Sequence, residues 1–191
     1  MNLEKYQQYS RIARGLEKAD LVLKNARIVN VFTEEIIRGD IAIQDGIIAG
    51  IGSFHGKEER DLAGRYVCPG FIDSHLHLES TLVTPAELVT VASRHGTTTF
   101  IVDPHESANV SGLAGIDYIL DQTEDVKANV YVMMPSCVPA TAIDDNGCTL
   151  TAEDMAPYLH NSRILGLGEV MDSISVVQGE KSMHDKLELF E

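Results

Sequence analysis

The sequence predicts an α/β protein in which a small β-rich unit precedes a parallel sheet flanked by helices. Short β-branched segments broken by turn residues fill the chain up to about residue 65. From Tyr66, strand-like and helix-like segments alternate in units of roughly 30 residues. With 191 residues, 44% hydrophobic and 23% charged, the chain has room for a small globular domain and part of a larger one. We therefore expect two domains, at residues 1–65 and 66–191.

The first domain is expected to begin with a surface helix and to continue as a small antiparallel β unit. Ile12, Ala13 and Leu16 recur at helical spacing within residues 3–18. Asp45-Gly46 lies between two apolar runs and is a strong signal for a type I′ hairpin turn. The expected strands are residues 21–24, 26–31, 36–44 and 47–51.

The second domain reads as four strand–helix units. Pro85 at the first position of a helix after Thr84 marks one helix start, and Thr151 marks another. Such alternation requires crossover connections and a parallel sheet. Four units fit half of a (β/α)8 barrel, which needs about 250 residues, so the sequence indicates either a smaller open sheet or the N-terminal part of a larger enzyme. The expected strands are residues 66–75, 97–103, 129–134 and 163–169, and the helices are 85–95, 112–122, 152–160 and 181–191.

The charge balance and the cysteine count exclude several classes of protein. Fifteen Lys and Arg against 29 Asp and Glu give a net charge of −14, which argues against nucleic-acid partners and anionic membranes. Three cysteines without a CxxC pair suggest neither a disulfide framework nor a zinc knuckle. We find no apolar run of signal-peptide or transmembrane length, so a cytoplasmic protein is expected.

The densest group of chemically competent side chains is the run PGFIDSHLHLES, residues 69–80. His75 and His77 lie two residues apart at the end of a predicted strand, so both imidazoles face the same side. That arrangement suits two ligands of one divalent ion. Asp73 shares this parity, and Glu79 shares it if the chain stays extended. The alternative is a polar loop without a metal.

Two further groups follow predicted strands, at the sheet edge where parallel α/β folds place their sites. In the first, DPHES, His105 and Glu106 are candidates for holding substrate or moving protons, with Asp103 a weaker candidate. Its alternative is a turn leading into a helix, with His105 in solvent. In the second, Glu169 ends the fourth strand, where its two oxygens can bridge two ions. The alternative there is a capping or surface acid.

The remaining histidines and Cys137 are not assigned to catalysis or to metal binding. His95 is expected at a helix terminus on the opposite face, and the other three histidines at the surface (His55, His160 and His184). Ser136 and Cys137 follow the third strand and are expected to line the mouth of the site. The spacing offers no base partner that would support a nucleophile there.

These motifs together resemble the amidohydrolase superfamily, and within it the metal-dependent adenine deaminases of bacteria and archaea. The resemblance covers residues 20–172. PGFID-HxH is shared widely in the superfamily, whereas HxHLES with VTPAE, HGTTT followed by DPHE, and PSCVPAT are more specific to adenine deaminases.

The resemblance implies a TIM-like (β/α)8 metal-dependent hydrolase barrel flanked by a β-sandwich that both chain ends build. On this mapping His75, His77 and Glu169 are metal ligands, and two Mn²⁺ are expected, with Fe²⁺ or Zn²⁺ as alternatives. The implied reaction converts adenine and water to hypoxanthine and ammonia in purine salvage. Proton transfer is assigned to Glu79, His105 and Glu106. The full-length enzyme is expected to be a homo-oligomer.

The sequence departs from this pattern at its far end. In the superfamily, two more histidines come from strands five and six and an aspartate from strand eight, and this chain holds only four units. We therefore expect an N-terminal portion of a longer enzyme, catalytically weak or inactive alone and exposing apolar surface. The alternatives are another cyclic-amide hydrolase, such as a dihydroorotase- or imidazolonepropionase-like enzyme, and a non-catalytic binding or assembly module.

Overall fold

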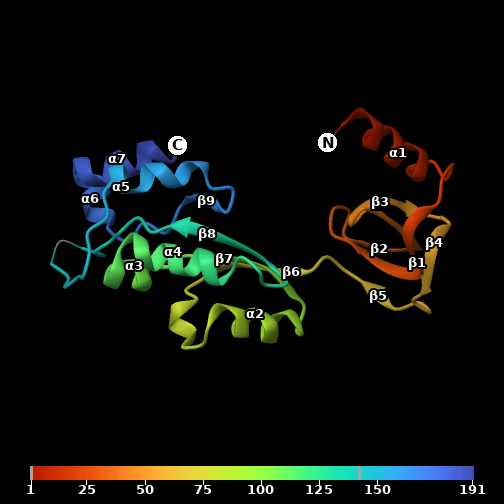
Figure 1. Cartoon of the computed structure of the whole chain (residues 1–191), viewed down its shortest axis with the longest axis horizontal. Coiled ribbons are helices and arrows are strands. Elements are labelled where there is room, and N and C mark those ends of the chain that lie inside the picture. The colour runs from red at the N-terminus through yellow and green to blue at the C-terminus, as the bar shows by residue number, and fades with distance from the viewer. Residues whose placement is uncertain (1, 142) are drawn as a thin grey trace. The chain divides into compact units, whose positions relative to one another are not determined.

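The chain divides into two compact units, residues 1–69 and 70–191. The computed structural model describes residues 2–141 and 143–191, and Figure 1 labels their helices and strands. The division lies four residues beyond the boundary expected after residue 65. The reason is a short strand, β5 (Tyr66–Val67), which pairs with the first strand of unit 1 instead of opening the second sheet.

Unit 1 consists of one helix and one mixed sheet in the order β3-β2-β1-β4, with β5 also on β1. β1 and β2 are antiparallel, as are β2 and β3, whereas β4 and β5 run parallel to β1. The described strands therefore form one sheet, and the two sheets of the expected sandwich are not shown. The elements are α1 (Leu3–Ala13), β1 (Ala19–Asn30), β2 (Glu35–Gln44), β3 (Ile47–Gly52) and β4 (Gly56–Asp61).

Local backbone conformation accounts for most of the differences from the expected first unit. Asp45 and Gly46 have φ of 52° and 75°, which confirms the type I′ turn. The two strands expected at 21–24 and 26–31 are one strand with an irregularity between Leu23 and Ala26, where Asn25 has φ of 56°. The helix is shorter than the expected 3–18 and gives way after Ala13 to a turn containing Gly15 at φ of 70°.

Unit 2 contains the expected parallel sheet, with its four strands in chain order. This order is consistent with the first half of a (β/α)8 barrel. The strands are β6 (Phe71–Leu76), β7 (Thr97–Val102), β8 (Asn129–Met134) and β9 (Ile164–Leu167). The helical elements are η1 (Glu79–Thr81), α2 (Pro85–Ser93), α3 (His105–Ser111), α4 (Leu113–Gln122), α5 (Ala152–Met155), η2 (Ala156–His160), α6 (Ser173–Gln178) and α7 (Lys181–Leu189).

Several helices of unit 2 differ from the expectation. α3 and α6 occupy segments for which the sequence predicted no helix. The helix expected at 152–160 changes to a 3₁₀ helix after Met155, because Pro157 has no N–H for an α-helical bond and its ring disfavours the α-helical turn before it. No helix in the described part of the chain is long and apolar enough to cross a membrane.

The core of unit 2 fixes the direction in which the strand ends point. Alternate residues of the two central strands are buried, among them Phe100, Val102, Val130 and Val132, and they pack against α4. Because the four strands are parallel, the segments that follow them leave the sheet at one edge. The polar residues identified in the sequence after these strands lie at this edge.

Candidate metal centre

Three segments from separate strands meet at the carboxyl edge of the second sheet. His75 lies near the end of β6 and His77 just past it. Asp103 directly follows β7, and Glu169 lies two residues beyond β9. Residues up to 94 positions apart in the sequence are thereby brought within reach of one another.

His75, His77 and Glu169 form a compact set of donor atoms. The two Nε2 atoms of the histidines are 3.2 Å apart. Oε1 of Glu169 lies 3.2 Å from Nε2 of His77 and 3.7 Å from Nε2 of His75. The side chains of His75 and Glu169 are about half exposed, so the group is open to solvent on one side.

This donor set fits a divalent ion. Ligands about 2.1 Å from one ion, at tetrahedral or octahedral angles, lie about 3.0–3.4 Å from each other. The spacing of the three donors is close to that range. Two imidazoles and a carboxylate are a mixed set that Mn²⁺, Fe²⁺ and Zn²⁺ all accept.

Glu106, from the first turn of α3, orients one of the two imidazoles. Its Oε2 lies 3.0 Å from Nδ1 of His77, and its Oε1 accepts a hydrogen bond from Ser80 Oγ at 3.1 Å. Because a carboxylate only accepts, Nδ1 carries the proton and the neutral ring leaves Nε2 free as a ligand. Burial lowers the pKa of His77, but the charge and hydrogen bond of Glu106 outweigh it, and the net pKa is raised.

Glu79 lies near His77 and Glu106, but it is not placed there by the alternation of side chains along an extended strand. The chain does not stay extended after β6 but turns into η1, so the conditional expectation for Glu79 fails. Its Oε1 accepts the backbone N–H of Ser107 at 3.0 Å, while its Oε2 is buried without a hydrogen-bond partner. Burial raises the pKa of Glu79. For Glu106 burial acts in the same direction, but the hydrogen bonds that its carboxylate accepts and the charge of His77 hold its pKa below the ordinary value.

Asp103 and His105 form a buried pair beside this centre. Oδ1 of Asp103 lies 2.5 Å from Nδ1 of His105, and the two side chains are 0% and 6% exposed. The His105 ring lies 6.0 Å from that of His77, and its Nε2 has no hydrogen-bond partner. The alternative of a solvated His105 is therefore wrong, because the unexpected helix α3 turns the ring into the protein.

Other sequence candidates lie outside the donor groups. Oδ1 of Asp73 accepts the His75 backbone N–H at 3.4 Å, and Asp73 belongs to none of the three donor groups found among the described residues. The four remaining histidines are exposed, in keeping with their surface and helix-end interpretations (His55, His95, His160 and His184).

Ser136 has a closer connection to the centre than the sequence indicated. It is fully buried, and its hydroxyl donates to the backbone carbonyl of Glu169. The only sequence signal is positional, since Ser136 follows β8 as Asp103 follows β7.

The sequence of unit 2 matches the model of the amidohydrolase family over residues 66–189. The chain belongs to the amidohydrolase family. Among curated relatives, this amidohydrolase is 57% identical over 190 residues to the adenine deaminase of Desulfitobacterium hafniense, covering 100% of this chain and 33% of the relative. Proteins of the same name from Geobacillus kaustophilus and Clostridium acetobutylicum are 51% and 50% identical, with 90% and 93% of this chain and 30% and 31% of those relatives covered.

The amidohydrolase chain thus spans about a third of the length of the curated relatives it matches. A solved structure, N-acyl-D-glutamate deacylase from Bordetella bronchiseptica, superposes with a TM-score of 0.47 and 22% identity, over 62% of this chain and 30% of that chain.

Proposed function

We propose that this amidohydrolase chain supplies the first part of the active site of an adenine deaminase. The reaction is adenine plus water to hypoxanthine plus ammonia, in which the bond from C6 to the amino nitrogen breaks and a C6–oxygen bond forms. The observation that carries the proposal is the match, at 57% identity over the whole of this chain, to a relative named adenine deaminase. The convergence of His75, His77 and Glu169 on one point supports it.

The proposal assigns a divalent metal centre to these three side chains, with two Mn²⁺ as the expected ions and Fe²⁺ or Zn²⁺ as alternatives. A divalent ion lowers the pKa of a bound water, which supplies a nucleophile near neutral pH. Glu169 lies in two donor groups, one with the histidine pair and one with Asp103 and His105. Its two carboxylate oxygens would therefore allow Glu169 to serve as a ligand shared by two ions.

The proton transfers are assigned to Glu79, Glu106 and His105. Glu79 keeps its proton to higher pH than an ordinary glutamate, which suits a donor to the leaving nitrogen. Glu106 is ionised, holds the ring of His77 and can accept a proton. The buried Nε2 of His105 is an unpaired site for a proton in transit.

The proposal extends to the setting of the enzyme. It places the sheet of unit 2 in a (β/α)8 barrel and the sheet of unit 1 in a β-sandwich of the full-length protein. It also assigns a cytoplasmic homo-oligomer that serves purine salvage. The acidic net charge of −14 is compatible with a small-molecule substrate instead of a nucleic acid.

The test is a chimera in which residues 1–190 replace the matching third of the Desulfitobacterium hafniense relative. We expect Mn²⁺-dependent conversion of adenine to hypoxanthine, followed by ultraviolet absorbance, and loss of more than about a hundredfold on His75→Ala. The matched control is His160→Ala, which removes an exposed imidazole outside the donor groups.

Two further arms separate the alternatives. Dihydroorotate and imidazolonepropionate serve as competing substrates, and turnover of either in place of adenine would contradict the proposal. The 191-residue chain alone is expected to turn over weakly, since the resemblance places further ligands on later strands. An inactive chimera that holds no metal would favour a non-catalytic module.

A further inference from the structure

Glu169 stands outside the regular hydrogen bonding of its strand. β9 ends at Leu167, and the last ladder-like contact is the Gly168 N–H to the carbonyl of Met134 at 2.7 Å. The next residue is Glu169, which the strand itself no longer holds. A carboxylate that must meet two imidazoles needs a backbone fixed by other means.

The N–H of Glu169 is held by Asp103. Oδ2 of this fully buried carboxylate accepts the bond at 2.9 Å. The approach is so close that a Cβ on Gly168 would lie 2.2 Å from Oδ2 of Asp103. A hydrogen bond to a charged acceptor is stronger than one between neutral groups.

The carbonyl of the same residue is held by Ser136. The buried hydroxyl donates to the Glu169 oxygen, and the Ser136 carbonyl in turn accepts from Lys186 Nζ at 2.8 Å. Lys186 is 6% exposed, and no carboxylate oxygen of the described residues lies within ion-pair distance of it. The position of Ser136 is thereby tied to α7.

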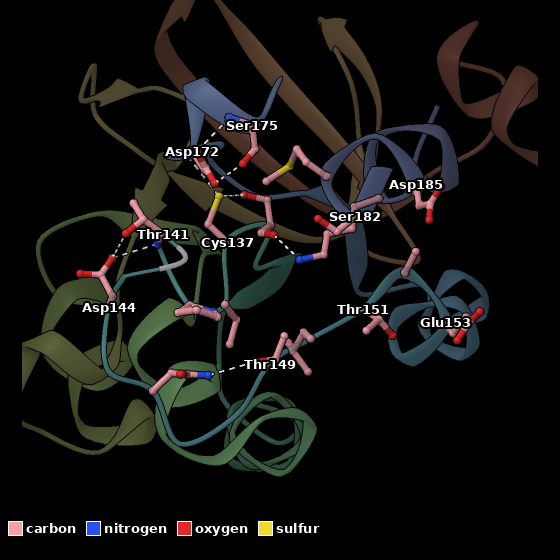
Figure 2. A pocket seen from close by; sticks show the side chains of 18 residues that line it. Cys137, Thr141, Asp144, Thr149, Thr151, Glu153, Asp172, Ser175, Ser182 and Asp185 are labelled. Carbon is pink, nitrogen blue, oxygen red and sulfur yellow. Dashed lines mark hydrogen bonds between the residues drawn. The ribbon is translucent and has the colours of Figure 1, made fainter. Parts of the chain in front are cut away.

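A third bond joins the same two segments. The thiol of Cys137 accepts the N–H of Asp172 at 3.4 Å, and Figure 2 shows Cys137 beside Asp172 and Ser175. These residues line a cavity of about 540 Å³ to which Ser136 also contributes but Asp103 does not. Water from this cavity can replace a lost Ser136 hydroxyl. Asp103 does not line this cavity, and its carboxylate is a charged acceptor, whose hydrogen bond contributes more than that of a neutral hydroxyl.

We infer that Asp103 and Ser136 are positioning residues that hold the backbone of Glu169 from both sides and so aim its carboxylate at the proposed metal centre. The inference rests on the proposed function for the presence of the ion. The two hydrogen bonds themselves do not depend on it.

The first test measures amide hydrogen exchange in the 191-residue chain without metal, by nuclear magnetic resonance. Asp103→Ala should speed exchange of the Glu169 amide by about ten- to a hundredfold. Asp103→Asn, which keeps an acceptor oxygen, should restore most of the protection, and core amides such as that of Val132 should not change. The matched control is Asp117→Ala, which removes an equal charge from an exposed hydrogen bond to Tyr158.

The second test measures binding of Mn²⁺ alone to the same variants. Asp103→Ala should weaken binding about ten- to a hundredfold, and Ser136→Ala by a smaller factor because of the cavity water. Ser93→Ala, which removes a hydroxyl bonded to the Val89 carbonyl within α2, is the control for Ser136→Ala and should bind as the parent does.

The outcomes separate the two proposals. A Glu169 amide that exchanges equally fast in the parent and in Asp103→Ala overturns the holding role. Altered exchange with unaltered Mn²⁺ affinity overturns the link to the metal centre. A parent chain that protects the Glu169 amide but binds no Mn²⁺ contradicts the proposed metal centre and supports the backbone clamp.

Discussion

Replacing Gly168 by alanine tests the close approach on which the site depends. The added Cβ would lie 2.2 Å from Oδ2, 2.8 Å from Cγ and 3.0 Å from Oδ1 of Asp103. Real Cβ atoms do not approach other atoms as closely as 2.2 Å or 2.8 Å. The Asp103 side chain is fully buried, so it cannot relieve the contact by moving into solvent, and a close-packed interior resists its displacement. The φ of Gly168 is not in the left-handed region, so the effect is one of contact and not of backbone strain.

The size of the effect follows from two losses. Overpacking a filled site costs about 1–3 kcal/mol. Displacing Asp103 also breaks its bond to the Glu169 N–H, and a hydrogen bond to a charged group contributes about 1.5–3 kcal/mol. We therefore expect Gly168→Ala to lower the free energy of unfolding of unit 2 by about 2.5–6 kcal/mol and to weaken Mn²⁺ binding about ten- to a hundredfold.

Gly166, which lies within β9 two residues before Gly168, offers a matched control. A Cβ there would meet only Met133 Cε, at an ordinary 3.7 Å. Gly166→Ala should change the free energy of unfolding by less than about 1 kcal/mol, because it restricts the unfolded chain without a clash. The assay is urea unfolding followed through the amide resonances of β8. Equal stability of the two variants would refute the close-approach argument.

Three further perturbations have defined outcomes. In the chain without metal, the raised pKa of His77 stabilises the folded state at pH values below the ordinary pKa of 6.5, and this stabilisation is lost as the pH rises through the raised value. His77→Gln should therefore lower the free energy of unfolding more at pH 6 than at pH 8.5. An equal loss at both pH values would contradict this ionisation. Glu106→Gln should weaken Mn²⁺ binding about tenfold or more in a titration of the free ion, because His77 loses its charged orienting partner, and unchanged affinity would count against that role. Ile116→Ala leaves a cavity at a fully buried position in α4 and should lower the free energy of unfolding, measured in urea, by about 2–5 kcal/mol. Val110→Ala, at an exposed position, should lower it by less than about 0.5 kcal/mol.

Local sequence signals are sufficient for the strands and for the edge at which the chemistry lies. β-branched runs and turn residues predicted all four strands of unit 2, although β6 begins five residues later than expected. The pair His75 and His77 was placed correctly at a strand end, because two residues is the repeat of an extended chain. β5 lies within the strand expected at residues 66–75 and was not distinguished from β6, since two residues carry no periodicity of their own.

The sequence alone thus determined the α/β class, the parallel sheet and the segments that carry the polar side chains, because these depend on neighbours a few residues away. The tertiary structure decided which of those side chains meet. The bond from the Glu169 N–H to Asp103 spans 66 residues, and the Ser136 contact with Glu169 spans 33. Such contacts arise only when β7, β8 and β9 pack in order, and no repeat in the sequence encodes the distance between their ends. The burial of His105 likewise depends on tertiary structure, because segments distant in the sequence cover its side chain in the folded protein.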